Sequence, residues 1–391
     1  MAMEASIYRL RLRDILTVCV VGLLFLGFVM VQSASAKVSN SPGWALTNAG
    51  EKHAGFVGLA LITFFLVGRF DYRRLNSKPS ILNPVIWILM VSLIMCGLVL
   101  VPHVGREVNG ARRWLGVGPV QVQPSELAKW AIVLFLAWWL ASRENALATF
   151  KGLLLVLLPI AAFCFFIVKE DFGTAALIAS ASIAVLLVAN VKWWHLAIII
   201  PPAAAAGVFS VVHKSYRMQR MTAFLNPWAD PRGIGYHMIQ SLLSFSSGGI
   251  VGRGLGNGIQ KLGYLPEDTT DFIFAVICEE LGLFGAILTI ALYLGILYVV
   301  WRVIRQQRDA FAKFLALGVG CMIGLQAVIN IAVATVSVPT KGLSLPLVSA
   351  GGSGLIITSA ALGLLYSITR FEEETETIAP LSAPVSMLPV N

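Results

Sequence analysis

The chain has 391 residues, of which 57% are hydrophobic and only 13% are charged. Soluble globular domains carry about a quarter of their residues as charged side chains, so this composition excludes a soluble globule. The 29 Lys and Arg exceed the 20 Asp and Glu, giving a formal net charge of +9. The sequence therefore predicts an all-α polytopic membrane protein whose cations report its orientation.

Ten apolar segments are long enough to cross a hydrocarbon core of roughly 30 Å as helices. They lie near 15–35, 54–68, 82–102, 125–142, 152–168, 174–190, 193–212, 272–300, 314–338 and 354–370. Together they form one membrane domain over residues 15–370. A short N-terminal segment, 1–14, precedes it, and an acidic, then Pro- and Ser-rich tail, 371–391, follows and is expected to be disordered.

The basic clusters predict the orientation of this domain. With an even number of spans, both termini lie on one side, and that side carries the clusters at 9–13, 69–78 and 302–313. Lys and Arg concentrate in short cytoplasmic loops, so both termini are expected to be cytoplasmic. The loops near 36–53, 103–124, 213–271 and 339–353 then face outward. The largest, 213–271, lies between the seventh and eighth spans.

The end of this large loop is the first place to look for chemistry. In YLPEDTTDFIFA (264–275), Asp271 is the last polar residue before the next span. A charged group at the membrane is costly and marks a functional site. The same loop carries six Lys and Arg, among them Arg217 and Arg220. These cations suit an anion such as a diphosphate, with ordinary surface charge as the alternative explanation.

Two further motifs place charges near the outer face. In QPSELAK (123–129), Glu126 and Lys129 lie three residues apart and share a helical face. Mutual neutralisation that fixes helix packing and contact with a substrate are equally compatible with this spacing. In VNGARRW (108–114), Arg113 beside an aromatic residue is either an interfacial anchor or a phosphate contact.

The remaining outer motifs have structural explanations. GRGLGNG (252–258) follows no predicted strand, so its glycines indicate turns and close backbone approach rather than a phosphate-binding loop. The charges of KEDFGTA (169–175) are typical of a helix end. PTKGLSLPLVSAGGSG (339–354) is broken by Pro and Gly and is predicted to be re-entrant. Such backbone is tolerated at membrane depth only where protein covers it or water reaches it.

Taken in order on a ten-span frame, these motifs resemble the SEDS family (shape, elongation, division and sporulation) of peptidoglycan glycosyltransferases. The resemblance covers nearly all of residues 10–370 and rests on VNGARRW, QPSELAK, NPWADPRGIGYHMIQSL, YLPEDTTDFIFAVICEELG and PTKGLSLPLVSAGGSG. The PTKGL and YRMQRMTAFLNP forms are closer to the division branch than to the elongation branch. Three residues depart from the family pattern: Glu170 replaces a proline, Thr269 a histidine and Ala350 a tyrosine.

The resemblance implies an activity and a site. The chain would polymerise lipid II into glycan strands at the outer face of the bacterial inner membrane, by inverting transfer with release of undecaprenyl diphosphate. The family's essential aspartate falls on Asp271 and its LPE glutamate on Glu267. Candidate substrate contacts are the cations Lys129, Arg217, Arg220 and Arg113, with Glu126 beside the first of them.

The resemblance also implies partners and a counter-ion. The expected partners are a class B penicillin-binding protein, which would supply the transpeptidase, other divisome proteins and membrane lipids, with no nucleic acid. Mg²⁺ or Mn²⁺ is implied as a counter-ion for the diphosphate, although the sequence contains no dedicated ligand set, and no organic cofactor is implied.

Two other functions remain open. One is a transporter that flips lipid II, for which the buried charges of Glu126 and Lys129 would suit a path. Against it, no inverted repeat is apparent and the polar residues gather on one face. The other is a non-catalytic scaffold for division proteins, which leaves Asp271 and the cationic loop unexplained.

Overall fold

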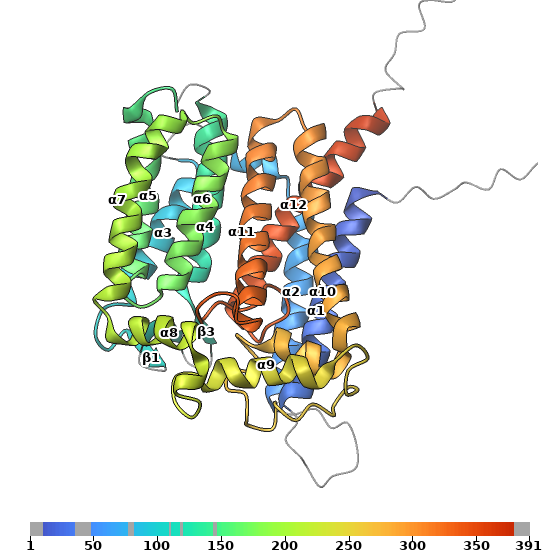
Figure 1. Ribbon diagram of the computed structural model, residues 1–391. Helices are drawn as coiled ribbons and strands as arrows, with labels where there is room; N and C mark the ends of the chain where they lie inside the picture. Colours follow the sequence, from blue (N-terminus) through green and yellow to red (C-terminus); the bar gives the residue numbers. More distant parts are fainter. Residues whose placement is uncertain are drawn as a thin grey trace, which may run out of the picture.

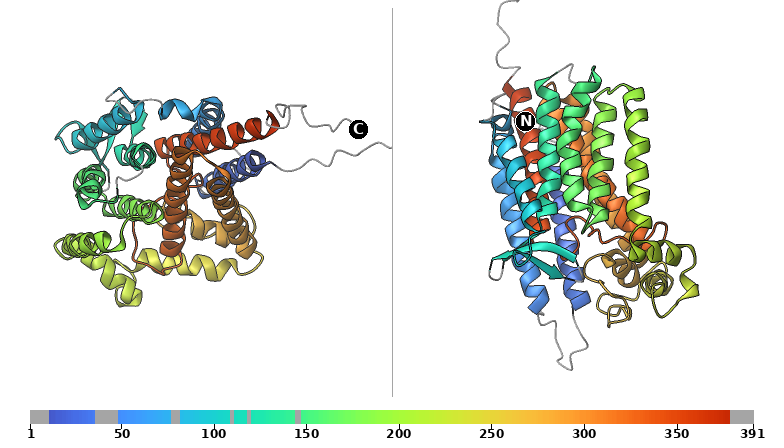
Figure 2. Two further views of the ribbon diagram at one scale, coloured as in Figure 1. Left: turned by 90° about the horizontal axis from the view of Figure 1, so that it is seen from above. Right: turned by 90° about the vertical axis from the view of Figure 1, so that its left-hand side faces the viewer.

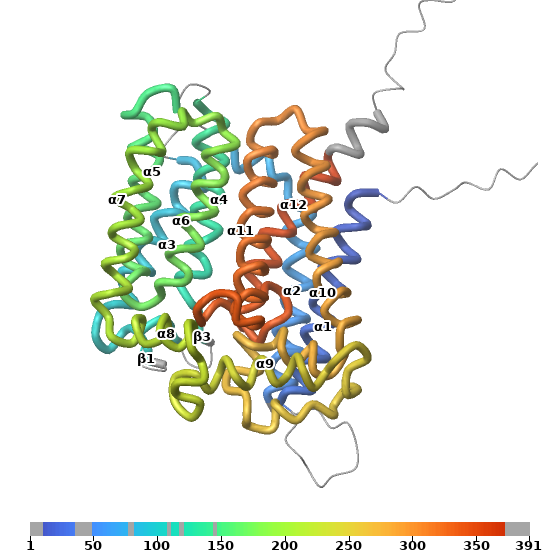
Figure 3. The backbone as a smooth tube through the Cα atoms, in the orientation of Figure 1, coloured from blue at the N-terminus to red at the C-terminus, as the bar shows by residue number. Residues whose placement is uncertain are grey.

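A computed structural model describes residues 11–35, 48–76, 82–108, 111–117, 120–143 and 147–378. Its helices run side by side in a bundle, and two short helices lie across one end of it (Figure 1). The smooth trace of the backbone shows the same arrangement (Figure 3). The first and last described helices begin and end, respectively, at the opposite end of the bundle (Figures 1 and 2).

Each of the ten predicted spans coincides with a helix. The bounds are α1 Leu12–Ser35, α2 Asn48–Arg69, α3 Pro84–Leu98, α4 Pro124–Ser142, α5 Phe150–Ile167, α6 Phe172–Val188, α7 Trp193–Val212, α10 Ile273–Gln306, α11 Ala310–Ala334 and α12 Ser353–Ile378. Among the described residues, eight of these helices are long and apolar enough to cross a membrane. The other two, α3 and α6, have 15 and 17 residues, fewer than the roughly 20 that a full crossing needs.

The centre of the bundle is formed by α4 and α11, which pack closely together. In Figure 1 they join the group formed by α3, α5, α6 and α7 to the group formed by α1, α2, α10 and α12. Apolar side chains such as Ile132 on α4 and Val319 on α11 are fully buried. The contact between α4 and α11 therefore connects the two groups of helices.

The loop near 103–124 contains a small antiparallel sheet, which the prediction of an all-α fold missed. Its strands are β1 Gly105–Val108, β2 Ala111–Val117 and β3 Val120–Val122, in the order β1-β2-β3. The register pairs Arg106 with Trp114 and Leu115 with Val122. The strands are three to seven residues long, too short for their alternation to stand out beside long apolar helices.

Three short helical elements lie in the first part of the large loop 213–271. These are α8 Ser215–Leu225, a 3₁₀ turn η2 Pro227–Ala229 and α9 Tyr236–Gly248. The apolar run at 238–245 lies in α9, which crosses the end of the bundle and packs against α10 (Figure 1). A second 3₁₀ turn, η1 Tyr72–Leu75, follows α2.

Two helices, α10 and α12, have features that the sequence did not predict. Near its start, α10 is broken at Gly282, whose φ of 63° and ψ of −153° are non-helical. The short helical piece before the break is therefore held apart from the long membrane helix after it. At the other end of the chain, α12 runs to Ile378, so residues 371–378, expected to be disordered, are helical. The rest of the tail lies outside the described residues.

Candidate active site

A cavity of about 320 Å³ lies where β2, α8, the start of α10 and the 339–354 segment meet, and we call it the carboxylate cavity. Five of the seven predicted site residues line it: Arg113, Glu126, Arg220, Glu267 and Asp271. The other two, Lys129 and Arg217, do not reach it. Residues from four separate stretches of sequence therefore converge on one space.

Asp271 is held in place through its backbone. The Asn330 side chain on α11 donates to the Asp271 carbonyl at 2.9 Å and to the Leu343 carbonyl at 2.7 Å. Ser349 Oγ donates to the Thr270 carbonyl at 2.6 Å. The 339–354 segment and Asn330 therefore hold the backbone before α10 in place. The sequence did not single out Asn330 and Ser349 because neither carries a charge.

The Asp271 carboxylate, in contrast to its backbone, has no hydrogen-bond donor within the described part of the chain. Gly342 lies beside the carboxylate. A Cβ added at this position would lie 3.3 Å from Asp271 Oδ2 and 3.7 Å from an Arg113 terminal nitrogen. A glycine at this position therefore leaves the carboxylate accessible to the cavity.

The surroundings of Asp271 raise its pKa. Burial is the main cause, and the nearby carboxylates of Glu267 and Asp171 add to it, while Arg220 and Arg113 oppose it. Together they raise the pKa of Asp271 from 3.8 to about 7. A carboxyl group with a pKa near the working pH is suited to accept a proton in catalysis.

Glu267 occupies a strained turn beside Asp271. Its φ is 56°, an uncommon conformation for a residue with a side chain. Its carboxylate accepts a hydrogen bond from Thr270 Oγ1 at 2.7 Å, and its carbonyl accepts one from the Phe272 N–H at 3.1 Å. Glu267 therefore shapes the turn that presents Asp271 and adds negative charge to the cavity.

Glu126 and Lys129 form a buried ion pair at the floor of the cavity. Lys129 Nζ lies 2.8 Å from Glu126 Oε1 and donates to Gln326 Oε1 on α11 at 2.8 Å. The Lys129 side chain is fully buried, whereas Glu126 reaches the cavity. Of the two interpretations left open by the sequence, this geometry favours mutual neutralisation and packing for Lys129.

The two arginines of α8 have different roles. Arg220 faces the cavity, donates to the Thr340 carbonyl at 3.1 Å and lies over the Tyr216 ring. Arg217 instead donates to the carbonyls of Val168 at 2.7 Å and Ser210 at 3.0 Å, and also to Ser210 Oγ. Arg217 therefore joins α8 to the ends of α5 and α7.

The three departures from the family pattern lie around this site. Glu170 accepts a hydrogen bond from the Arg112 N–H at 2.9 Å and so attaches β2 to the start of α6. The Ala350 N–H donates to the Thr269 carbonyl at 2.9 Å. Positions 269 and 350 therefore contact each other through backbone atoms, and this contact does not depend on which side chains occupy them.

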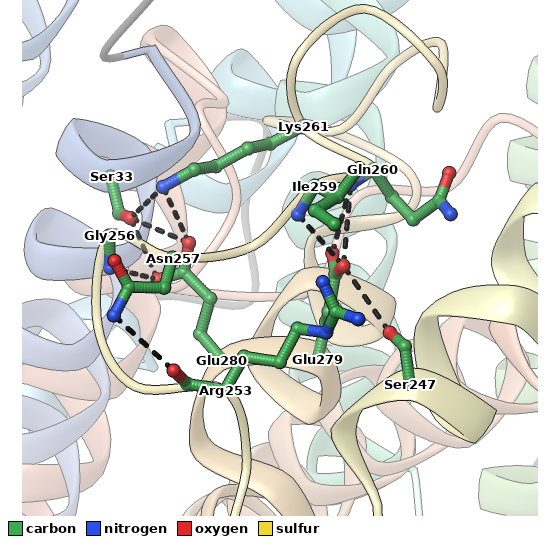
Figure 4. A network of polar contacts seen from close by, with 10 residues as sticks. All are labelled: Ser33, Ser247, Arg253, Gly256, Asn257, Ile259, Gln260, Lys261, Glu279 and Glu280. Carbon is green, nitrogen blue, oxygen red and sulfur yellow. Dashed lines mark hydrogen bonds and ion pairs between the residues drawn. The ribbon is translucent and has the colours of Figure 1, made fainter. Parts of the chain in front are cut away.

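A second set of carboxylates lies nearby and is fully satisfied. Glu279 and Glu280, both completely buried before the break in α10, are wrapped by the glycine-rich loop (Figure 4). Lys261 Nζ lies 2.6 Å from Glu280 Oε1, and Ser33 Oγ on α1 donates to both oxygens of Glu280. The N–H groups of Gly256 and Ile259 donate to Glu280 and Glu279, respectively.

The glycines of this loop allow its close approach. Gly252 has a φ of 82°, and an added Cβ would lie 2.3 Å from the Glu280 carbonyl oxygen. The N–H groups of Arg253 and Gly254 donate to the carbonyls of Glu279 and Glu280. The prediction of a structural role for GRGLGNG is consistent with these contacts.

The residues present do not fit a protein-bound metal ion. Among the described residues, no group of three His, Cys, Asp or Glu side chains is arranged to hold one. Mg²⁺ and Mn²⁺ prefer several oxygen ligands, and Glu126, Glu267 and Asp271 do not provide a shared ligand set. Mg²⁺ or Mn²⁺ as a counter-ion for the substrate's diphosphate stays a prediction.

Comparisons with known proteins agree with this architecture. The family of cell cycle proteins named for FtsW, RodA and SpoVE matches residues 13–374. A probable peptidoglycan glycosyltransferase FtsW of Nitrosococcus halophilus is 40% identical over 361 residues, 90% of this chain and 91% of that protein. Its counterpart from Coxiella burnetii is 36% identical, covering 92% of this chain and 96% of that protein.

Solved structures share the fold over almost the whole chain. A chain of a peptidoglycan synthase complex that coordinates polymerization and crosslinking is 30% identical, with a TM-score of 0.71, covering 91% of this chain and 97% of that chain. The rod shape determining protein RodA of Thermus thermophilus is 28% identical, with a TM-score of 0.64, covering 91% and 96%. The chain is therefore a multi-pass membrane protein that belongs to the FtsW, RodA and SpoVE family of cell cycle proteins.

Proposed function

We propose that this chain is a peptidoglycan glycosyltransferase that polymerises lipid II in cell division, at the outer face of the bacterial inner membrane. The single observation that carries the proposal is Asp271, whose carboxylate accepts no hydrogen bond from a described residue and has a pKa near 7, in a cavity that also presents Arg113 and Arg220. The similarity to proteins named peptidoglycan glycosyltransferase FtsW supports the substrate class.

Asp271 serves as the general base. A sugar hydroxyl is a poor nucleophile until a base removes its proton. The 4-hydroxyl oxygen of the acceptor forms a bond to the anomeric carbon of the donor as its proton passes to Asp271. The carbon–oxygen bond to the donor's diphosphate breaks, and its electron pair leaves with undecaprenyl diphosphate. One displacement inverts the anomeric carbon.

The leaving group explains why one carboxylate suffices. Hydrolysis of ordinary glycosides uses a second carboxyl group, which protonates a poor leaving oxygen. A diphosphate leaves as a stabilised anion, so cations take the place of that acid. Arg113 and Arg220, which face the same cavity as Asp271, supply this charge.

A class B penicillin-binding protein is the proposed partner. Glycan strands made by this chain require crosslinking by a transpeptidase, which such a partner supplies. Similarity to a chain of a complex that coordinates polymerization and crosslinking supports this pairing.

The test is glycan synthesis from purified lipid II in detergent, with the partner present. We expect β-1,4-linked glycan from the parent chain and almost none from Asp271→Asn, with the amount of folded protein matched by size-exclusion chromatography. Detergent removes the second leaflet, so transport has no meaning there. If no glycan forms, yet the protein moves labelled lipid II between the leaflets of vesicles, the transporter replaces the polymerase.

A further inference from the structure

A second cavity, of about 500 Å³, adjoins the carboxylate cavity and has the opposite charge. The two share lining residues, among them Arg113, Arg220 and Gly342. Six cationic side chains line the second space, which we call the cationic cavity: Arg113, Lys169, Lys214, Arg217, Arg220 and Lys341. The sheet, the α5–α6 turn, α8 and the segment after α11 supply them.

The two acidic residues of the cationic cavity are already in use. Asp171 caps α6, with Oδ1 accepting from the Thr174 N–H at 3.0 Å and Oδ2 from Thr174 Oγ1 at 2.7 Å. Glu170 accepts a hydrogen bond from the backbone of Arg112. Neither carboxylate forms an ion pair with a lysine of this cavity within the described chain. Six cations against two engaged carboxylates leave the space strongly positive.

Three of the cations have side-chain amines without a polar partner in the described part of the chain. The Nζ atoms of Lys169, Lys214 and Lys341 form no hydrogen bond and no ion pair there, although their backbone atoms are hydrogen-bonded. Lys341 is half-buried, with Nζ 5.2 Å from the centre of the Phe172 ring, and this burial lowers the pKa of its amine. A buried amine without a counter-charge is costly, and an anion in the cavity would relieve that cost.

The frame of the cationic cavity is fixed independently of these lysines. Arg217 holds α8 to the carbonyls of Val168 and Ser210. Arg220 is held by the Thr340 carbonyl, next to Lys341. The lysines therefore project from a framework that other residues maintain, so replacing one lysine should leave the cavity standing.

We infer that the cationic cavity receives the lipid-linked diphosphate of the glycosyl donor, with Lys341 and Lys214 as its ligands. The inference rests on the proposed function and assigns the two substrates to the two cavities. In a single displacement the entering oxygen and the leaving oxygen lie on opposite sides of the anomeric carbon. Asp271 faces the entering hydroxyl in the carboxylate cavity. The leaving diphosphate therefore lies in the cationic cavity, with Arg113 and Arg220 at the junction of the two cavities.

The test measures binding of farnesyl diphosphate, a short polyprenyl diphosphate, to the full chain in phosphatidylcholine nanodiscs. We expect Lys341→Met and Lys214→Met each to raise the Kd about tenfold, because each removes a charge-assisted contact. Lys151→Met is the matched control, since this exposed lysine lies at the far end of α5, and it should leave the Kd unchanged.

The other outcomes are equally informative. Equal binding by the parent and both cavity variants would overturn the assignment. So would displacement of farnesyl diphosphate by phosphatidylglycerol in the nanodisc, which would make the cavity a lipid headgroup site. If binding follows the prediction while no glycan is made from lipid II, the anion site stands and the proposed polymerase fails.

Discussion

Two groups of carboxylates lie within ten residues of each other and have opposite surroundings. Glu279 and Glu280 are completely buried and receive hydrogen bonds from backbone N–H groups, Ser33 and Ser247, with Lys261 as counter-charge. Asp271 lies in a cavity where no hydrogen bond from a described residue reaches its carboxylate, and burial raises its pKa to about 7.

This difference separates a structural carboxylate from a reactive one. A buried charge that is fully hydrogen-bonded stabilises one conformation, and removing one partner leaves an uncompensated charge. A carboxylate without partners is available for a proton that arrives with the substrate. Burial alone therefore does not separate the two groups, whereas the hydrogen bonds to their carboxylates do.

The largest expected effect is on catalysis at Asp271. Asp271→Asn keeps the shape of the side chain and loses the base, so we expect glycan synthesis to fall ~10²–10⁴-fold. The melting temperature in detergent should not fall. A well-folded variant that makes glycan at the parent rate would remove Asp271 from the mechanism.

The next effect is on stability at the satisfied pair. Lys261→Met leaves Glu280 as an unpaired buried charge, which should cost about 3–5 kcal/mol. Thermal unfolding in detergent measures this loss, with Lys151→Met as control. The double variant Lys261→Met, Glu280→Gln should recover part of the stability. Unchanged melting of Lys261→Met would show that the pair is not structural.

A smaller effect is expected for Glu126 and Lys129. If they neutralise each other, each single variant, Glu126→Gln or Lys129→Met, should lower stability by about 1–3 kcal/mol. The double variant should lose less than the sum of the two. If Lys129→Met instead melts like the parent while its KM for lipid II rises, the contact with substrate is the correct interpretation.

The last effect is the pH dependence of stability caused by Asp271. In the folded state this group keeps its proton up to about pH 7, whereas unfolded it ionises near 3.8. The folded protein therefore loses stability as the pH rises through this window. Asp271→Asn, which does not titrate, should melt at a higher temperature than the parent at pH 8 and at the same temperature near pH 4. An equal difference at both pH values would contradict the raised pKa.

The helical frame was predictable from sequence because long apolar runs have few alternatives in a membrane. Each of the ten predicted segments coincides with a helix, although α3 and α6 are shorter than a full crossing needs. The short strands of the outer sheet were missed, since three to seven residues give little periodic signal. The break at Gly282 was also missed, because a glycine within an apolar segment does not by itself predict a positive φ.

The site was predictable only in part. Charged motifs identified Asp271, Arg113 and Arg220, which meet in one cavity. Helical spacing paired Glu126 with Lys129. The packing of α4 against α11, which the sequence does not reveal, brings Gln326 into hydrogen-bond contact with Lys129, so that the amine does not line the cavity. Neutral positioning residues such as Asn330 act through long-range contacts that no local pattern reveals.

The central claim is that ionised Asp271 accepts the proton, and the pH dependence of single-turnover glycan synthesis tests it most directly. The parent should show a rate that rises with pH to a plateau, with its midpoint near the Asp271 pKa of about 7. Asp271→Asn should be slow and should lack this rise. A parent rate that is flat between about pH 5.5 and 8.5, or the same rise in the Asn variant, would contradict the claim.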